Sequence, residues 1–100
     1  MLYTIPIFHN PLGLSITRQN AEAVVDYAAA NAILVVSDEP YSLLQYQSAP
    51  AASANSISTT STTSALTTLM EIDRGRGVVA SLGSYSKILS PGMRCGWIHA

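Results

Sequence analysis

The sequence contains few of the residues that define several common classes of protein. Its 100 residues include one cysteine, Cys95, which gives neither a disulfide framework nor a zinc-binding pattern. No apolar run approaches the roughly 20 residues that a membrane-spanning helix needs, and no signal-peptide pattern follows Met1. These absences argue against a disulfide-rich secreted module. They predict a cytoplasmic protein that makes no contact with a membrane.

Charged residues are also scarce, at 11% of the chain, which is less than half of the usual quarter. The net charge is −1, so there is no basic surface of the kind that binds nucleic acid. The one basic cluster, "RGRG" from Arg74 to Gly77, is predicted to be a turn. Because so few charges leave much uncharged surface to cover, we expect a piece of a larger protein or a chain that buries its faces against a partner.

Four short apolar runs are predicted to be strands, and they cover residues 3–8, 33–37, 78–83 and 95–100. Between the first two runs, alanine and valine recur at three- and four-residue spacing, which predicts a helix over residues 17–30. Ser15 or Thr17 can cap its N-terminus and Asn31 its C-terminus. The order strand, helix, strand is typical of an α/β fold.

The first three predicted strands are expected to lie parallel in one sheet, because continuous apolar runs are typical of strands buried on both faces. The short connection to residues 95–100 favours an antiparallel return, since a parallel crossover needs about a dozen residues. Residues 47–68 are rich in serine, threonine and alanine, and we expect an irregular low-complexity insertion there. One obvious crossover helix cannot cover both faces of such a sheet, so we interpret the chain, residues 1–100, as part of a domain.

Polar side chains follow each of the three predicted parallel strands. Asn10 comes after the first, Asp38 and Tyr41 after the second, and Ser84 and Lys87 after the third. Open α/β sheets bind ligands at the carboxyl ends of their strands. We therefore expect these side chains to lie together along one edge of the sheet.

Lys87 is the only lysine of the chain. A partly desolvated lysine at a strand end is nucleophilic toward carbonyl groups, and a carboxylate such as Asp38 can pair with a cationic ring nitrogen. Amide and phenol groups can donate to a ring oxygen, and a serine with Arg94 suits a phosphate. A pyridine ring with an aldehyde, a hydroxyl and a phosphate needs all of these groups, which favours pyridoxal phosphate.

Taken one at a time, these residues have ordinary structural interpretations. Lys87 could be a solvated charge, Tyr41 half-buried packing and Arg94 a partner in a surface ion pair. Glu39 is interpreted as structural. The hypothesis depends on the three motifs that follow the strands in order, not on any one of them.

Those motifs, "FHNPLG", "VVSDEPY" and "SYSKILSPGMRCGW", resemble the class I/II aminotransferases, which are pyridoxal-phosphate enzymes of fold type I. The resemblance runs from Tyr3 to Ala100 outside the insertion. It implies a fragment of the large, cofactor-binding domain, whose mostly parallel sheet has seven strands, with an antiparallel last strand here. It implies that Asn10 and Tyr41 bind the ring hydroxyl of the cofactor and that Asp38 pairs with the ring nitrogen. It also implies that Lys87 forms the Schiff base and that Ser84 and Arg94 hold the phosphate.

The resemblance also implies transfer of an amino group between an L-amino acid and a 2-oxo acid, in a homodimer. The spacing from Lys87 to Arg94 resembles the branch related to aminoadipate and aromatic aminotransferases. A C–S lyase or an aminocyclopropane-carboxylate synthase of the same fold, and a non-catalytic truncated remnant, stay open as alternatives. The family's substrate-carboxylate arginine would lie beyond Ala100, and its ring-stacking aromatic residue before Met1.

Overall fold

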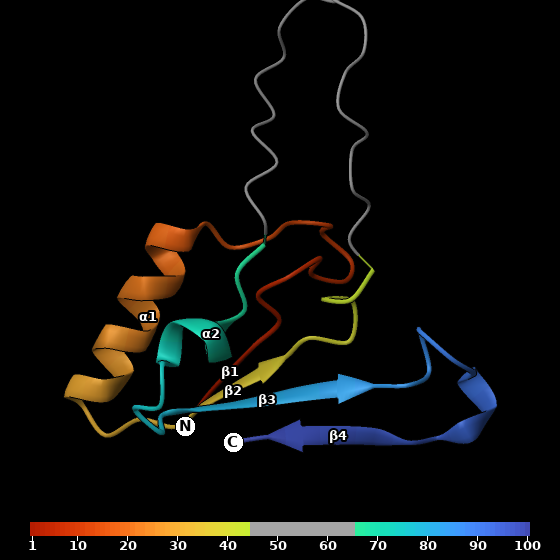
Figure 1. The fold of residues 1–100 in the computed structure, drawn as a ribbon. Helices are drawn as coiled ribbons and strands as arrows, with labels where there is room; N and C mark the ends of the chain where they lie inside the picture. Colours follow the sequence, from red (N-terminus) through yellow and green to blue (C-terminus); the bar gives the residue numbers. More distant parts are fainter. Residues whose placement is uncertain (45–65) are drawn as a thin grey trace, which may run out of the picture.

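The structure is a computed structural model, and it describes residues 1–44 and 66–100. These residues form a layer of two α-helices on one side of a four-stranded sheet (Figure 1). The elements in chain order are β1 (Leu2–Thr4), α1 (Arg18–Ala30), β2 (Val35–Asp38), α2 (Leu69–Asp73), β3 (Val79–Ser84), the short 3-10 helix η1 (Pro91–Met93) and β4 (Gly96–His99). None of the helices in these two ranges has the length and apolar character to cross a membrane.

The sheet confirms the predicted α/β class and strand directions. Its order is β1-β2-β3-β4; β1, β2 and β3 are parallel, and β4 runs antiparallel beside β3. The register places Tyr3 opposite Val36 and Asp38 opposite Leu82. The carboxyl ends of three neighbouring strands therefore meet at one edge of the sheet.

The first strand is shorter than predicted and ends at Thr4 instead of residue 8. Pro6 has no N–H to donate to a neighbouring strand, and its carbonyl accepts a hydrogen bond from the Ile16 amide at 2.7 Å. Phe8 has a φ of 49°, which is incompatible with an extended strand. Ile7 nevertheless stays buried, so this segment contributes to the core after it leaves the sheet.

The second strand begins at Val35 instead of residue 33 because the preceding residues complete the helix end. The Ile33 amide donates to the Ala28 carbonyl at 3.0 Å, and Ala32 has a left-handed φ of 51°. Asn31 is the C-cap, as predicted, and its side-chain amide donates to the Tyr27 carbonyl. The other strand ends differ from the predictions by one residue.

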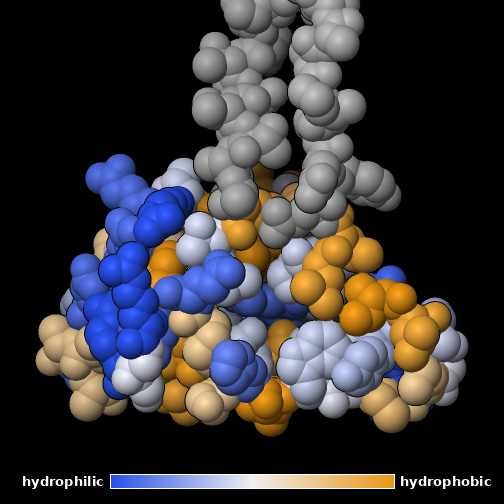
Figure 2. Space-filling model, viewed as in Figure 1, coloured by the Kyte–Doolittle hydropathy of each residue, from blue (hydrophilic) through white to orange (hydrophobic). Residues whose placement is uncertain are grey.

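At the helix start, Thr17 is the N-cap and accepts from the Asn20 amide. The alternative cap, Ser15, accepts instead from the Phe8 amide, which ties the helix start to the turn after β1. Figure 2 shows that α1 presents a hydrophilic side to solvent. Its other side packs on the sheet, as the predicted apolar spacing requires.

The hydrophobic core lies between the two helices and one face of the sheet. It is formed by alanine, valine, leucine and isoleucine side chains that are nearly inaccessible to solvent: Ala21, Val25, Ala28, Val35, Leu69, Ile72 and Val79. Within the two described ranges no helix covers the opposite face, where Tyr3 is 55% and Ile98 71% exposed. This agrees with the prediction that these elements cannot cover both faces of a parallel sheet.

The insertion predicted over residues 47–68 falls outside the described residues, except for its last three. Of these, Thr68 is the N-cap of α2 and forms a capping box with Glu71. The Thr68 hydroxyl accepts from the Glu71 amide at 3.2 Å, and the Glu71 carboxylate accepts from the Thr68 amide at 2.9 Å.

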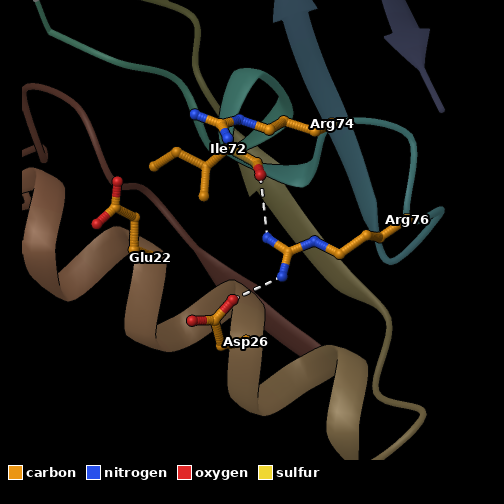
Figure 3. A pocket seen from close by; sticks show the side chains of 5 residues that line it. All are labelled: Glu22, Asp26, Ile72, Arg74 and Arg76. Atoms are coloured by element: carbon orange, nitrogen blue, oxygen red, sulfur yellow. Dashed lines mark hydrogen bonds and ion pairs between the residues drawn. The ribbon is translucent and has the colours of Figure 1, made fainter.

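The "RGRG" segment is a turn between α2 and β3, as predicted, and it also joins the two helices. The Arg76 guanidinium donates to the Asp26 carboxylate at 2.6 Å and to the Ile72 carbonyl at 3.0 Å, as Figure 3 shows. Its Nε donates to the Asp73 carbonyl at 3.0 Å. The hollow drawn in Figure 3 is thus bridged by an arginine that satisfies carbonyls at the end of α2.

The pairing of β3 with β4 places Trp97 opposite Gly83. The indole lies over Gly83, so that a Cβ atom at this position would overlap the Trp97 ring. The Tyr85 ring also packs against the indole, with its centroid 4.7 Å from that of Trp97 and an interplanar angle of 55°. Glycine is therefore required here by close packing.

We predict that Gly83→Ala destabilises the protein by about 1–3 kcal/mol, the usual cost of overpacking. The matched control is Gly92→Ala, because the nearest atom to a Cβ there is the Ser90 hydroxyl oxygen at 3.8 Å. Urea unfolding of the two variants measures the difference. Equal unfolding midpoints for both variants would contradict the packing argument.

Candidate functional site

The candidate site lies at the edge where β1, β2 and β3 end. Asp38 and Ser84 are the last residues of β2 and β3. The turns that follow the strands contain Asn10, Tyr41 and Lys87. Parallel pairing of three adjacent strands thus brings three turns to the same side of the sheet.

The turn after β1 forms one wall of a cavity of about 380 Å³. The turn is held by two backbone hydrogen bonds, from the His9 amide to the Leu14 carbonyl and from the Gly13 amide to the His9 carbonyl. Gly13 has a φ of 67°, which suits glycine. The cavity is lined by Phe8, His9, Asn10, Pro11, Gly13, Tyr41 and Leu44. The structure therefore places Asn10 and Tyr41 at one cavity.

His9 belongs to this cavity, although sequence reasoning gave it no part in the site. Its Nδ1 atom is buried and has no hydrogen-bond partner among the described residues. A buried polar atom without a partner is uncommon and points to a ligand or a water molecule. No pattern in "FHNPLG" distinguishes this histidine from a structural one.

Asp38 has one hydrogen-bond partner among the described residues. The Tyr3 phenol donates to its Oδ2 atom at 2.6 Å. This hydrogen bond raises the pKa of the Tyr3 phenol, with smaller contributions from burial and from the negative charge of the carboxylate. Tyr3 was also missed by sequence reasoning, because the contact depends on the register between β1 and β2.

Glu39 follows Asp38 directly but points into the interior, where it is only 4% exposed. Its Oε1 atom accepts from the Ser37 hydroxyl at 2.6 Å and from the Leu69 amide at 3.3 Å. Its Oε2 atom accepts from the Ser81 hydroxyl at 3.3 Å. One carboxylate thus joins β2, β3 and the start of α2, which agrees with the structural interpretation of Glu39.

The backbone of Glu39 also shapes the turn that contains Tyr41. Its carbonyl accepts from the amide and the hydroxyl of Ser42, at 3.2 and 3.0 Å. Its own amide donates to the Leu82 carbonyl at 2.9 Å. Asp38 and Tyr41 are therefore positioned from either side of one anchored residue.

The turn after β3 presents the lysine. Within it the Ser84 hydroxyl accepts from the Ser86 amide at 3.1 Å, and the Tyr85 carbonyl accepts from the Leu89 amide at 2.9 Å. The Lys87 Nζ atom lies 5.8 Å from the centroid of the Tyr41 ring. No ion pair in the described ranges involves Lys87, so its amine faces an aromatic ring and no carboxylate.

Arg94 is held by the backbone of η1, the turn that begins at Pro91. It is the C-cap of that turn and has a left-handed φ of 52°. None of the ion pairs among the described residues includes it. The Pro-Gly turn therefore fixes its backbone.

Contacts join some of the predicted site residues but not all of them. Asn10 and Tyr41 line one cavity, and Lys87 lies over the Tyr41 ring. No side-chain hydrogen bond or ion pair of the described residues connects Ser84 or Arg94 with the others. Nor does any group of three histidine, cysteine or acidic side chains in these ranges suit a metal ion.

Comparison with known proteins gives an independent description of the chain. Residues 5–100 match the family model described as aminotransferase class I and II. Aromatic-amino-acid aminotransferase 1 of Thermococcus litoralis is 32% identical over 100 residues, which is 100% of this chain and 20% of that protein.

Solved structures give the same result. LysN, an α-aminoadipate aminotransferase of Thermus thermophilus complexed with N-(5'-phosphopyridoxyl)-L-leucine, superposes with a TM-score of 0.76 and 30% identity, over 100% of this chain and 22% of that one. Kynurenine aminotransferase of Pyrococcus horikoshii, in complex with PMP, superposes with a TM-score of 0.74 and 30% identity, over 96% and 20% of the two chains. The chain therefore spans about a fifth of the length of these relatives.

We predict that Glu39→Ala destabilises the protein by about 2–4 kcal/mol, since buried donors at Leu69 and Ser81 would lose their acceptor. Glu39→Gln is the matched control, because its amide oxygen can still accept from Ser37 and the Ser81 hydroxyl can accept from its NH₂ group. We expect it to cost less than half as much. Thermal or urea unfolding measures both, and equal losses would contradict the role assigned to the network.

Proposed function

Because this chain belongs to the aminotransferase class I and II family, we propose that the protein containing it is a pyridoxal-phosphate-dependent aminotransferase. The observation that supports this most directly is that Asn10, Tyr41 and Lys87 meet at the carboxyl edge of the sheet. We further propose that it transfers an amino group between an L-amino acid and a 2-oxo acid, and that it works as a homodimer in the cytoplasm.

The set of donors and acceptors at the site fits pyridoxal phosphate. An amide and a phenol line one cavity, and a lysine amine lies over the phenol ring. The Asp38 carboxylate has one oxygen, Oδ1, with no hydrogen bond from the described residues. Arg94 forms no ion pair within them. A polar heterocycle with a hydroxyl, a basic nitrogen and a phosphate could use each of these groups.

In this proposal each residue binds a different group of the cofactor. Asn10 and Tyr41 would donate to the ring hydroxyl, and Asp38 would accept from the protonated ring nitrogen. The Ser84 hydroxyl, which accepts from the Ser86 amide, keeps its own hydrogen for the phosphate, and Arg94 would supply a charge-assisted donor. The chemistry that the bound cofactor supplies is an aldehyde that joins amines and a ring that takes up electrons.

Lys87 would have two functions at its Nζ atom. The amine would hold the cofactor through its aldehyde in the resting enzyme, and when released it would move a proton at the α-carbon of the substrate. Asp38 would keep the ring nitrogen protonated, because a negative charge beside a cation favours the charged form. Glu39 anchors the turn between Asp38 and Tyr41 and so keeps these two groups in place.

The similar proteins guide the choice of substrate. Their names include aromatic amino acids, kynurenine and α-aminoadipate, and we propose an amino donor from the aromatic or aminoadipate classes. A lyase or synthase of the same fold would use the same cofactor residues. Incubation of the full-length protein with such a donor and 2-oxoglutarate distinguishes a transaminase from a lyase or synthase, because only a transaminase forms glutamate.

We predict that borohydride reduction of the full-length protein, loaded with pyridoxal phosphate, fixes a pyridoxyl group on Lys87. Lys87→Ala should abolish both this adduct and transamination, since it removes the covalent attachment and the proton carrier together. Peptide mapping by mass spectrometry measures the adduct. A pyridoxyl group on a different lysine would contradict the assignment.

We also predict that Asp38→Ala leaves the adduct on Lys87 but lowers turnover by on the order of a hundredfold or more, as for other groups that stabilise developing charge directly. The reason is that a neutral ring nitrogen takes up electrons poorly. Steady-state kinetics and the same peptide mapping give the two readouts. Undiminished turnover would contradict the role of Asp38.

A further inference from the structure

Among residues 1–44 and 66–100, Tyr3 is the one residue outside the predicted set that contacts the candidate site through a hydrogen bond as short as 2.6 Å. It lies in β1 opposite Val36, so its side chain is on the same sheet face as Val36 and, two residues on, Asp38. The Tyr3 phenol reaches from β1 across to the end of β2 and donates to Asp38 Oδ2 at 2.6 Å. A distance this short is typical of a hydroxyl that donates to an ionised carboxylate.

Among the described groups around Asp38, the Tyr3 phenol is the one that holds the Asp38 carboxylate in place. On the same face of β3 the neighbours of Asp38 are Ala80, Leu82 and Ser84, which have no charge, and no hydrogen bond among the described residues joins Ser84 to Asp38. The titratable side chains in the turns that follow β1, β2 and β3 are His9, Glu39, Tyr41, Tyr85 and Lys87. No hydrogen bond or ion pair among the described residues joins any of them to Asp38. Oδ2 is therefore occupied by Tyr3, and Oδ1 is available to another donor.

We propose that Tyr3 is a positioning residue for the ring nitrogen of the cofactor. It fixes the plane of the Asp38 carboxylate through Oδ2 and so reserves Oδ1 for a protonated pyridine nitrogen. The inference rests on the proposed function. It adds a residue that sequence motifs do not include, since Tyr3 acts through Asp38 and is held to it only by the strand register.

The hydrogen bond itself can be tested without the cofactor. In the full-length apoprotein, with tyrosines labelled at the ring carbon that bears the hydroxyl, the NMR signal missing from Tyr3→Phe identifies Tyr3. Its pKa should lie above the ordinary value in the wild type and fall in Asp38→Asn, because the carboxylate that retains the proton is gone. An unchanged titration in Asp38→Asn would overturn the proposal at its first step.

The positioning role is tested on the loaded enzyme with pyridoxal phosphate labelled with ¹⁵N in the ring. The ¹⁵N signal reports directly whether the ring nitrogen is protonated. In Tyr3→Phe this nitrogen should lose its proton at a lower pH than in the wild type, and turnover should fall about tenfold, the effect of losing one hydrogen bond to a charged group. The phenyl ring remains, so packing on the sheet is kept.

Tyr27→Phe is the matched control, because it removes a hydroxyl from an exposed tyrosine on α1, in the helical layer. It should leave the ¹⁵N titration and turnover unchanged. If Tyr3→Phe also leaves the ¹⁵N titration unchanged while the adduct on Lys87 still forms, the role of Tyr3 is wrong and the proposed function stands. If no adduct forms on Lys87 in the wild type, the proposed function fails, and the inference fails with it.

Discussion

The carboxylate of Glu39 joins three segments that are distant in sequence, and the geometry of the site depends on it. It accepts hydrogen bonds from β2, β3 and the first residue of α2, in a position that is almost closed to solvent. A buried carboxylate is costly unless donors surround it, so these three segments are held to one arrangement. Asp38, which precedes it, and Tyr41, two residues after it, gain fixed backbone positions from this constraint. The site is thus positioned from the interior of the fold.

Much of the fold follows from local patterns in the sequence. The spacing of alanine and valine placed α1 within a residue of its ends, because a buried helix face must repeat every three to four residues. Short connections and continuous apolar runs gave the strand directions. The end of β1 and the start of β2 were less predictable, since Pro6 and Ile33 make hydrogen bonds to segments other than their neighbouring strands. Those bonds depend on where the chain folds back, which local propensity does not specify.

The candidate site, like the fold, contains residues that the sequence predicts and residues that only the structure shows. Asn10, Asp38, Tyr41 and Lys87 could be named because they follow predicted strands in recognisable motifs. Tyr3 could not, because its contact with Asp38 exists only for one register of β1 against β2. The depth of the Glu39 network was equally hidden, since its partners, serine hydroxyls and a backbone amide, have no distinctive sequence pattern. Side chains that act through another residue are visible only in three dimensions.

The small number of charges affects how a ligand reaches the site. All six acidic side chains accept hydrogen bonds from described residues: Glu22, Asp26, Asp38, Glu39, Glu71 and Asp73. Arg18 and Arg76 form ion pairs with two of them. Within the described residues Lys87 and Arg94 form none, so no paired carboxylate cancels their positive field. An anion at the carboxyl edge of the sheet is therefore attracted by these two cations and repelled by Asp38, and raised ionic strength weakens both effects.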